Sequence, residues 1–94
     1  VSCKLLDLLE TAVREEPLDW RMNHYLCREY RQFDDWLKVL QSAYKTFALP
    51  DGWDIERAST CMWASEAADR MQLPHLAVEW AEKATASAPH FILK

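Results

Sequence analysis

The chain has 94 residues, of which 50% are hydrophobic and 12% aromatic, and its formal net charge is −4. This length suits one domain, and the composition is too apolar for a disordered segment. The acidic balance and the lack of any basic tract argue against a nucleic-acid-binding protein. The longest uncharged window, residues 84–93, is too short to span a bilayer, so we expect no membrane segment.

The glycine and cysteine content indicates helices in a reducing environment. Gly52 is the single glycine, and helices joined by short loops need few turn glycines, so the composition favours an all-α fold. Three widely spaced cysteines, Cys3, Cys27 and Cys61, disfavour a disulfide framework and fit a cytoplasmic location. Since the chain begins with Val1 and shows no signal peptide, we expect it to be a piece of a longer protein.

The first predicted helix covers about residues 2–15, with Ser2 as a possible cap. Its apolar side chains recur at the helical period, at Leu5, Leu6, Leu9, Ala12 and Val13. Pro17 ends this helix, because the residue before a proline avoids the helical conformation.

The second and third predicted helices cover about residues 18–31 and 34–48. The second carries Met22, Tyr25, Leu26 and Tyr30 on one side, and the third carries Trp36, Val39, Leu40, Ala43 and Phe47. The pair Asp34–Asp35 is placed to stabilise the start of the third helix. Residues 50–52, Pro-Asp-Gly, form the clearest turn signal in the chain.

The fourth predicted helix covers about residues 54–71, with Asp54 as its N-cap. Pro74 suits the first position of a fifth helix that ends before Pro89 and turns Ala77, Val78, Ala81 and Ala84 inward. Residues 90–94 look like the start of another helix. Helices of this length with short links pack as antiparallel neighbours.

An internal pattern connects two of the prolines. Small or apolar residues stand 5, 8 and 12 positions before each: Ala84, Ala81 and Ala77 before Pro89, and Ala12, Leu9 and Leu5 before Pro17. This pattern resembles the second helix of a tetratricopeptide repeat, in which small residues let two helices approach closely. In the middle unit, Leu26, Cys27 and Tyr30 take the first-helix places, and Val39, Leu40 and Ala43 take the second-helix places.

The chain also departs from that repeat. Asp34 and Gln72 or Leu73 stand where such repeats usually carry glycine, Thr46 replaces a usual alanine, and a turn at residues 51–53 lengthens one link. The resulting prediction is an all-α, right-handed superhelical stack of about five antiparallel helices. Residues 1–16 form a trailing helix, 18–50 and 54–89 form two repeats, and 90–94 begin the next helix. Apolar residues at the two ends, Leu5, Leu6, Phe91, Ile92 and Leu93, make a homodimer through exposed helix edges plausible.

A narrower resemblance covers residues 7–91. The segments that carry it are Leu8–Glu10 with Arg14–Pro17, Tyr25–Tyr30, Ala48–Asp54 with Glu56–Arg57, Ala77–Trp80, and Ala88–His90. Together they resemble the tetratricopeptide region that follows the catalytic domain in some bacterial and phage family 2 glycosyltransferases. The resemblance implies an accessory, non-catalytic region, since the nucleotide-sugar domain with its metal-binding aspartate motif is not part of these 94 residues.

Residue spacing offers little for catalysis or metal binding. His24, His75 and His90 lack the i, i+3 or i+4 spacing of a helical metal site, so we expect no metal and no cofactor. The carboxylate pairs Asp34–Asp35 and Asp51/Asp54 are more typical of helix starts than of acid–base catalysis. We therefore expect no enzymatic activity from this segment, and a structural role for Glu56–Arg57, with Arg57 reaching a carboxylate of the neighbouring repeat.

One predicted surface has binding chemistry. In stacked helix pairs the first helices line a concave groove, which here is expected to contain Arg21, His24, Arg28, Arg31 and Gln32 from one repeat and Ser59, Met62, Glu66, Asp69 and Arg70 from the next. Arginines on one helical stripe suit an acidic peptide, because each guanidinium donates two parallel hydrogen bonds. The alternative is a solvated face with ion pairs between repeats. Among the five tryptophans, Trp53 in the turn is the one expected to be exposed.

Three functional hypotheses follow. The preferred one is a non-catalytic interaction or scaffold module in the C-terminal part of a glycosyltransferase-like protein, with a protein, a peptide or the catalytic domain of its own parent chain as partner. The second is a free-standing adaptor that binds acidic peptides through the arginine stripe. The third is direct contact with the acceptor during glycosyl transfer.

Overall fold

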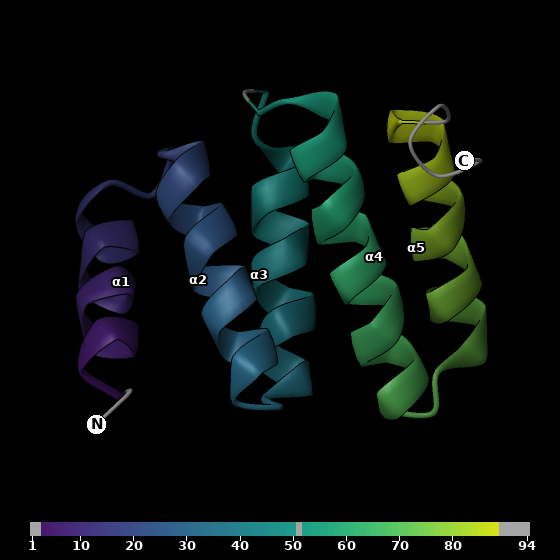
Figure 1. Ribbon diagram of the computed structural model, residues 1–94, viewed down its shortest axis with the longest axis horizontal. Coiled ribbons are helices and arrows are strands. Elements are labelled where there is room, and N and C mark those ends of the chain that lie inside the picture. The colour runs from purple at the N-terminus through teal and green to yellow at the C-terminus, as the bar shows by residue number, and fades with distance from the viewer. Residues whose placement is uncertain (1–2, 51, 89–94) are drawn as a thin grey trace.

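The computed structural model describes residues 3–50 and 52–88, which form five α-helices and no β-strand. The helices are α1 (Cys3–Glu15), α2 (Trp20–Gln32), α3 (Trp36–Ala48), α4 (Asp54–Arg70) and α5 (Pro74–Ser87). Consecutive helices alternate in direction and stand side by side in a row (Figure 1). The all-α prediction is confirmed, and no helix within these ranges has both the length and the apolar character needed to cross a bilayer. The expectations for Val1, Ser2, Asp51, Pro89 and residues 90–94 lie outside the described residues.

Local capping explains where the helices begin. The Asp19 carboxylate accepts a hydrogen bond from the Met22 N–H at 3.1 Å, so α2 begins two residues later than predicted. Asp35 caps α3 in the same way, through the N–H of Lys38 at 3.4 Å. The prediction of Asp54 as the cap of α4 is wrong. Trp53 holds the N-cap position with no side-chain bond, and Asp54 lies in the first turn, where a carboxylate favours the positive helix end.

The turns inside the two helix pairs, α2–α3 and α4–α5, have the same geometry. Asp34 has a φ of 57° and Gln72, 38 positions later, has a φ of 61°. The following residue in each turn, Asp35 or Leu73, donates its N–H to the carbonyl five residues back, at 3.0 and 2.8 Å. This left-handed conformation is the one that glycine adopts most easily, and here Asp34 and Gln72 adopt it instead.

A side-chain hydrogen bond is also repeated in the two pairs. The Cys27 thiol donates to the Val39 carbonyl at 3.5 Å, and the Ser65 hydroxyl donates to the Ala77 carbonyl at 2.7 Å. Both residues of the second bond follow their counterparts by 38 positions. The α4–α5 pair is therefore a structural repeat of the α2–α3 pair in both its turn and its interhelical contact.

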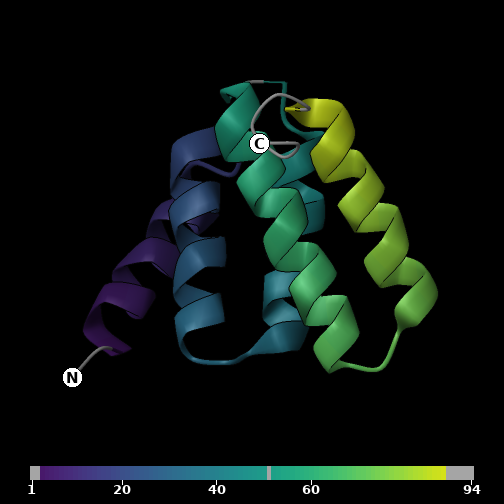
Figure 2. The same ribbon diagram turned by 45° about the vertical axis from the view of Figure 1, so that its right-hand side comes forward.

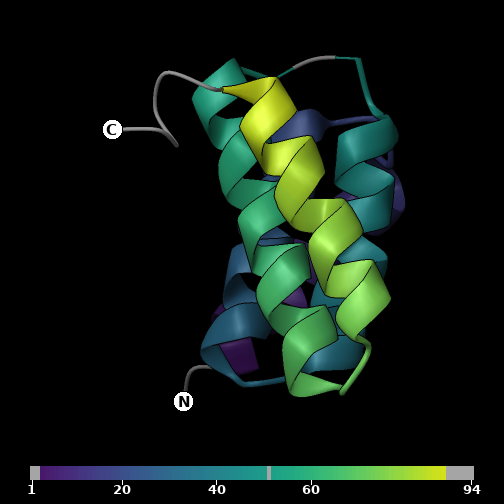
Figure 3. The ribbon, with the colours of Figure 1, turned by 90° about the vertical axis from the view of Figure 1, so that its right-hand side faces the viewer.

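The helices form two layers around a core that contains both large apolar side chains and small ones. Each helix packs against the next along the chain, and α2 also packs against α4. In Figure 2, α2 and α4 lie toward the viewer with α3 behind them, and Figure 3 shows the row end-on from α5. The core contains several small side chains, which permit close helix approach: Cys27, Ala43, Cys61, Ala64, Ala67 and Ala84.

The predicted inward face of α5 is partly wrong. Ala84 is buried, but Ala77 is half-buried, Ala81 is exposed, and Val78 is 57% exposed. Besides Ala84, the buried residue of α5 is Trp80. The centroid of its ring lies 4.9 Å from that of Tyr44 and 5.7 Å from that of Phe47, both on α3. Because α5 is the last described helix of the row, only the side that faces α3 and α4 is covered.

The opposite end of the row shows a similar asymmetry. On α1, Leu9 is buried and both Leu6 and Val13 pack against the core, whereas Leu5 and Leu8 are exposed. The expectation that Leu5 lacks a partner fits this burial, but the same expectation for Leu6 is wrong. Leu9, Leu6 and Val13 face the core, and Leu5 and Leu8 lie where α1 is not covered by α2.

Candidate interaction site between α2 and α4

The predicted groove residues lie on the layer formed by α2 and α4. We call this surface the α2–α4 face and define it by Arg21, Tyr25, Arg28, Arg31, Ser59, Met62, Glu66 and Arg70. Arg21 and Arg28 meet at one aromatic ring. Arg21 Nη1 donates to the Tyr25 hydroxyl at 3.4 Å, and the guanidinium carbon of Arg28 lies 4.9 Å from the Tyr25 ring centroid. Two of the three arginines expected on one side of α2 thus contact Tyr25.

The lower part of this face has one ion pair between α2 and α4 and a second within α4. Arg31 Nε donates to Glu66 Oε1 at 2.7 Å, and Arg70 lies 3.9 Å from the other oxygen of the same carboxylate. Arg70 also lies over the Trp36 ring, 5.3 Å from its centroid. Ion pairing between helix pairs, the alternative interpretation of the stripe, is thus correct for Arg31. Arg28 lies 3.9 Å from the carboxylate of Glu29 on its own helix, and the side chains of all three arginines are exposed. Gln32, at the end of the helix, is exposed as well.

The prediction that His24 lines the groove is wrong. Its ring is buried and stacked between Trp20, at a centroid distance of 4.8 Å, and Trp63, at 5.0 Å. Its Nδ1 atom lies 2.9 Å from the Thr60 hydroxyl of α4. Residues 21 and 28 share one side of α2 with residue 24, but α4 covers the part of that side where His24 lies.

Thr60 connects His24 to the backbone of α4. Its hydroxyl lies 2.9 Å from Nδ1 of His24 and 3.1 Å from the Glu56 carbonyl, and both hydrogen bonds are satisfied when Nδ1 carries the proton. Burial lowers the pKa of His24 below its usual 6.5, and Arg28 adds to this lowering while Glu56 opposes it. His24 is therefore a neutral interhelical connector at pH 7.

Arg57 has a structural role, as predicted, but with different partners. Its guanidinium donates to the carbonyls of Leu49 at 2.9 Å and Phe47 at 3.1 Å, and it lies 4.5 Å from the Phe47 ring centroid. The predicted carboxylate partner is wrong because the last carbonyls of α3 have no intrahelical donors and attract a cation. This contact joins the end of one helix pair to the start of the next.

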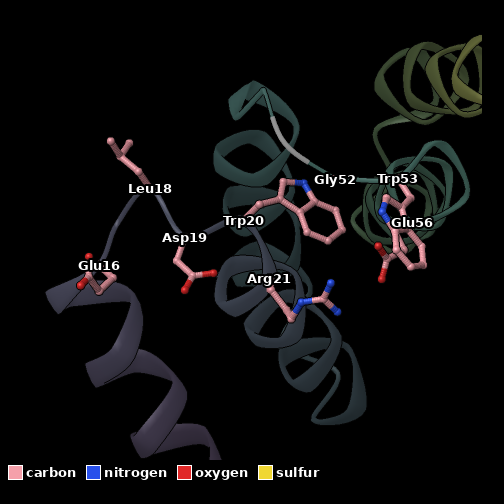
Figure 4. A pocket seen from close by; sticks show the side chains of 8 residues that line it. All are labelled: Glu16, Leu18, Asp19, Trp20, Arg21, Gly52, Trp53 and Glu56. Carbon is pink, nitrogen blue, oxygen red and sulfur yellow. The ribbon is translucent and has the colours of Figure 1, made fainter.

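Sequence reasoning missed a pocket at the upper end of the α2–α4 face (Figure 4). It has a volume of about 490 Å³, and we call it the end pocket. Its walls are Glu16, Leu18, Asp19, Trp20, Arg21, Gly52, Trp53 and Glu56. These residues come from the α1–α2 link, the start of α2, and the junction of α3 with α4. The only sequence signal for it was Trp53 in the turn, whose expected exposure is confirmed at 72%.

Two other hollows involve α4. One of about 360 Å³ lies within the α2–α4 face, between Arg31, Ser59, Met62, Trp63 and Glu66. A more apolar groove of about 560 Å³ runs between α4 and α5, where Met62, Val78 and Ala81 are exposed. Met62 borders both, so the two hollows adjoin on the outer side of α4.

Titratable side chains in the core do not form a reactive group. Burial raises the pKa of the Cys27 thiol to about 12 and that of Cys61 to about 11, so both stay protonated near neutral pH. Burial and the hydrogen bond to Glu10 likewise raise the pKa of Tyr30. Within residues 3–50 and 52–88, no three His, Cys, Asp or Glu side chains gather closely enough to hold a metal ion.

Comparison of the chain with family models, with characterised proteins and with solved structures finds no match. The function proposed for the chain is therefore inferred from the repeated geometry of the helix pairs and from the chemistry of the α2–α4 face.

Proposed function

We propose that this chain is a non-catalytic helical-repeat module that binds a protein or peptide segment along the α2–α4 face. The observation that carries the proposal is the recurrence of one turn and one interhelical hydrogen bond in both helix pairs, 38 positions apart. Stacked pairs of this kind are held by nearest-neighbour contacts and present an extended surface to partners. The same recurrence supports a repeat of helix pairs, and a tetratricopeptide-like, right-handed stack is part of the proposal.

The exposed groups of the face favour a partner with acidic residues. Arg21 and Arg28 carry exposed guanidinium groups on either side of Tyr25. Arg28 is paired only at 3.9 Å with Glu29, whereas Arg31 is bonded to Glu66 at 2.7 Å. Arginine and tyrosine are the side chains that most often dominate binding energy at protein interfaces. A carboxylate of the partner would accept two parallel hydrogen bonds from either guanidinium. This chemistry fits both a partner protein and a free acidic peptide.

The resemblance to the accessory region of family 2 glycosyltransferases adds a context to this proposal. In that context the partner is the catalytic domain of the same parent chain, and the module positions it or holds a third protein. The buried thiols and the neutral, enclosed His24 support a non-catalytic role for the segment. A cytoplasmic location remains part of the proposal.

The test is affinity capture with three forms of the immobilised chain: wild type, Arg21→Gln/Arg28→Gln, and Arg14→Gln/Lys45→Gln as a control with equal charge loss. Arg14 and Lys45 are exposed and line a different hollow, beside α1 and α3. We expect proteins retained by the wild type and the control to fall about tenfold or more on the Arg21/Arg28 variant, measured by quantitative mass spectrometry. Equal capture by all three forms, each with an unchanged circular-dichroism melting curve, would show that the α2–α4 face is not the binding surface.

A further inference from the structure

The apolar groove between α4 and α5, which we call the α4–α5 groove, has a counterpart elsewhere in the chain that is covered by a helix. In the α2–α3 pair, α4 packs on both helices. The α4–α5 pair repeats that pair at an offset of 38 positions, and the residues of the groove stand at the positions that α4 covers in the α2–α3 pair. Among the described helices, none takes the equivalent place on α4 and α5, which form one end of the row (Figure 1).

The exposure of equivalent residues shows the effect of the covering helix. Leu40 of α3 is 7% exposed, whereas Val78, its counterpart on α5, is 57% exposed. His24 of α2 is likewise 7% exposed, whereas Met62, its counterpart on α4, is 47% exposed. The groove therefore exposes apolar side chains at positions that belong to the core in the α2–α3 pair, and a helix placed over them would remove apolar surface from water.

The charge at the edge of the groove indicates which helix fits. In the covered pair, Arg31 of α2 donates to Glu66 of α4 at 2.7 Å. The counterpart of Arg31 in the groove is Asp69, an exposed carboxylate that forms no ion pair with other described residues. The sign of the charge is thus reversed at this position. A helix placed on the groove as α4 is placed on α2 needs a lysine or arginine where α4 has Glu66.

We propose that the α4–α5 groove binds an amphipathic helix of a partner protein, which packs on α4 and α5 as α4 packs on α2 and α3. The apolar side of this helix covers Met62, Val78 and Ala81, and a basic residue at its edge pairs with Asp69. The occupant is a helix, and not an extended segment, because a helix fills the equivalent place in the α2–α3 pair. This inference goes beyond the proposed function, since the groove does not involve Arg21 or Arg28.

The test uses three fluorescently labelled peptides based on residues 53–71, which contain the sequence of α4. One peptide has Glu66, one carries Glu66→Lys, and one carries Glu56→Lys, which has the same net charge but places its lysine elsewhere. All three carry Cys61→Ala, so that no disulfide forms. We expect the Glu66→Lys peptide to bind the full chain about threefold or more tighter than the other two, measured by fluorescence anisotropy. Equal affinities of the two lysine peptides, or no saturable binding of the Glu66→Lys peptide, would overturn the proposal.

Variants of the chain locate the binding surface. Val78→Asp places a charge in the apolar part of the groove and is expected to weaken binding of the Glu66→Lys peptide about tenfold or more. Asp69→Asn should remove the preference for that peptide over the Glu56→Lys peptide. The control is Leu37→Asp, at a residue of α3 that is 53% exposed and lies outside the groove, and it should bind like the wild type. Binding that is unchanged by Val78→Asp, in a variant with the melting curve of the wild type, would contradict the proposal.

A second copy of the chain is the competing occupant of the groove. Sedimentation velocity should show the same distribution of species for the wild type and Val78→Asp. A dimer that Val78→Asp abolishes, together with no peptide binding, would assign the groove to a second copy and overturn the proposal. None of these results depends on Arg21 or Arg28, so this inference and the proposed function fail separately.

Discussion

Gly52 lies directly against the indole ring of Trp20. A Cβ atom added at Gly52 would come within 2.3 Å of Trp20 Cε2 and 2.6 Å of Nε1. Gly52 also has a φ of +113°, which other residues rarely adopt. The single glycine of the chain therefore serves two purposes at once: it turns the link between α3 and α4, and it lets that link touch the start of α2.

We accordingly expect Gly52→Ala to lower the free energy of unfolding by about 1–3 kcal/mol, measured by urea denaturation. In a Trp20→Ala background the same substitution should cost less, because the steric conflict is gone and only the backbone strain remains. An equal cost in both backgrounds would show that the contact with Trp20 is unimportant.

A second prediction concerns the left-handed turn at Gln72. Glycine tolerates a φ of 61° without strain, so Gln72→Gly should raise the free energy of unfolding by about 0.5 kcal/mol, after the larger entropy of the unfolded chain is subtracted. Gln72→Val, with a β-branched side chain, should lower it by about 1 kcal/mol. Thermal unfolding of the three forms should rank them Gly, Gln, Val, and any other order would contradict the strain argument.

The close approach of helices around Ala43 gives a third prediction. Ala43 is completely buried in the core, so Ala43→Phe should lower the free energy of unfolding by about 1–3 kcal/mol through overpacking. The matched control is Ala48→Phe on the same helix, where the alanine is exposed and little change is expected. Comparable losses in the two variants would contradict the assigned packing.

The buried His24 makes stability dependent on pH. Because its folded-state pKa lies below the unfolded value of about 6.5, the unfolded state binds the proton more readily. The contribution of His24 to stability is complete above pH 6.5 and is lost as the pH falls toward the folded-state value. We expect the melting temperature to decrease between pH 7.5 and pH 5.5, with a smaller decrease in His24→Gln.

His75 provides the control for this experiment, since it is exposed at the start of α5. His75→Gln should keep the full decrease in melting temperature. If His24→Gln and wild type lost equal stability on acidification, carboxylates rather than His24 would account for the acid sensitivity.

The raised thiol pKa values give a last prediction. In a Cys3→Ser variant, Cys27 and Cys61 should react with a disulfide reagent at pH 8 far more slowly than free cysteine, because both are buried and protonated. Both should react fully in urea. Rapid reaction of either thiol in the folded protein would contradict its burial.

The five helices could be predicted from the residue pattern and from the local chemistry of the chain. Prolines, the apolar period and the turn at residues 50–52 predicted five helices whose ends agree with the structure to within about two residues. The resemblance marked Asp34 and Gln72 or Leu73 as positions where such repeats usually carry glycine, and Asp34 and Gln72 have a positive φ in the structure. These features depend on neighbours a few positions away along the chain, so the sequence by itself determined them.

The arrangement of the α2–α4 face depended on contacts between segments that are distant in the sequence. The helical period places Arg21, His24 and Arg31 on one side of α2, but it does not say that α4 buries His24 against Thr60 and pairs Arg31 with Glu66. Likewise, the end pocket joins residues 16–21 to residues 52–56, whose proximity comes from the packing of α4 on α2. Only the tertiary structure decided these matters, because periodicity defines the sides of a helix, and burial depends on which other helix covers each side.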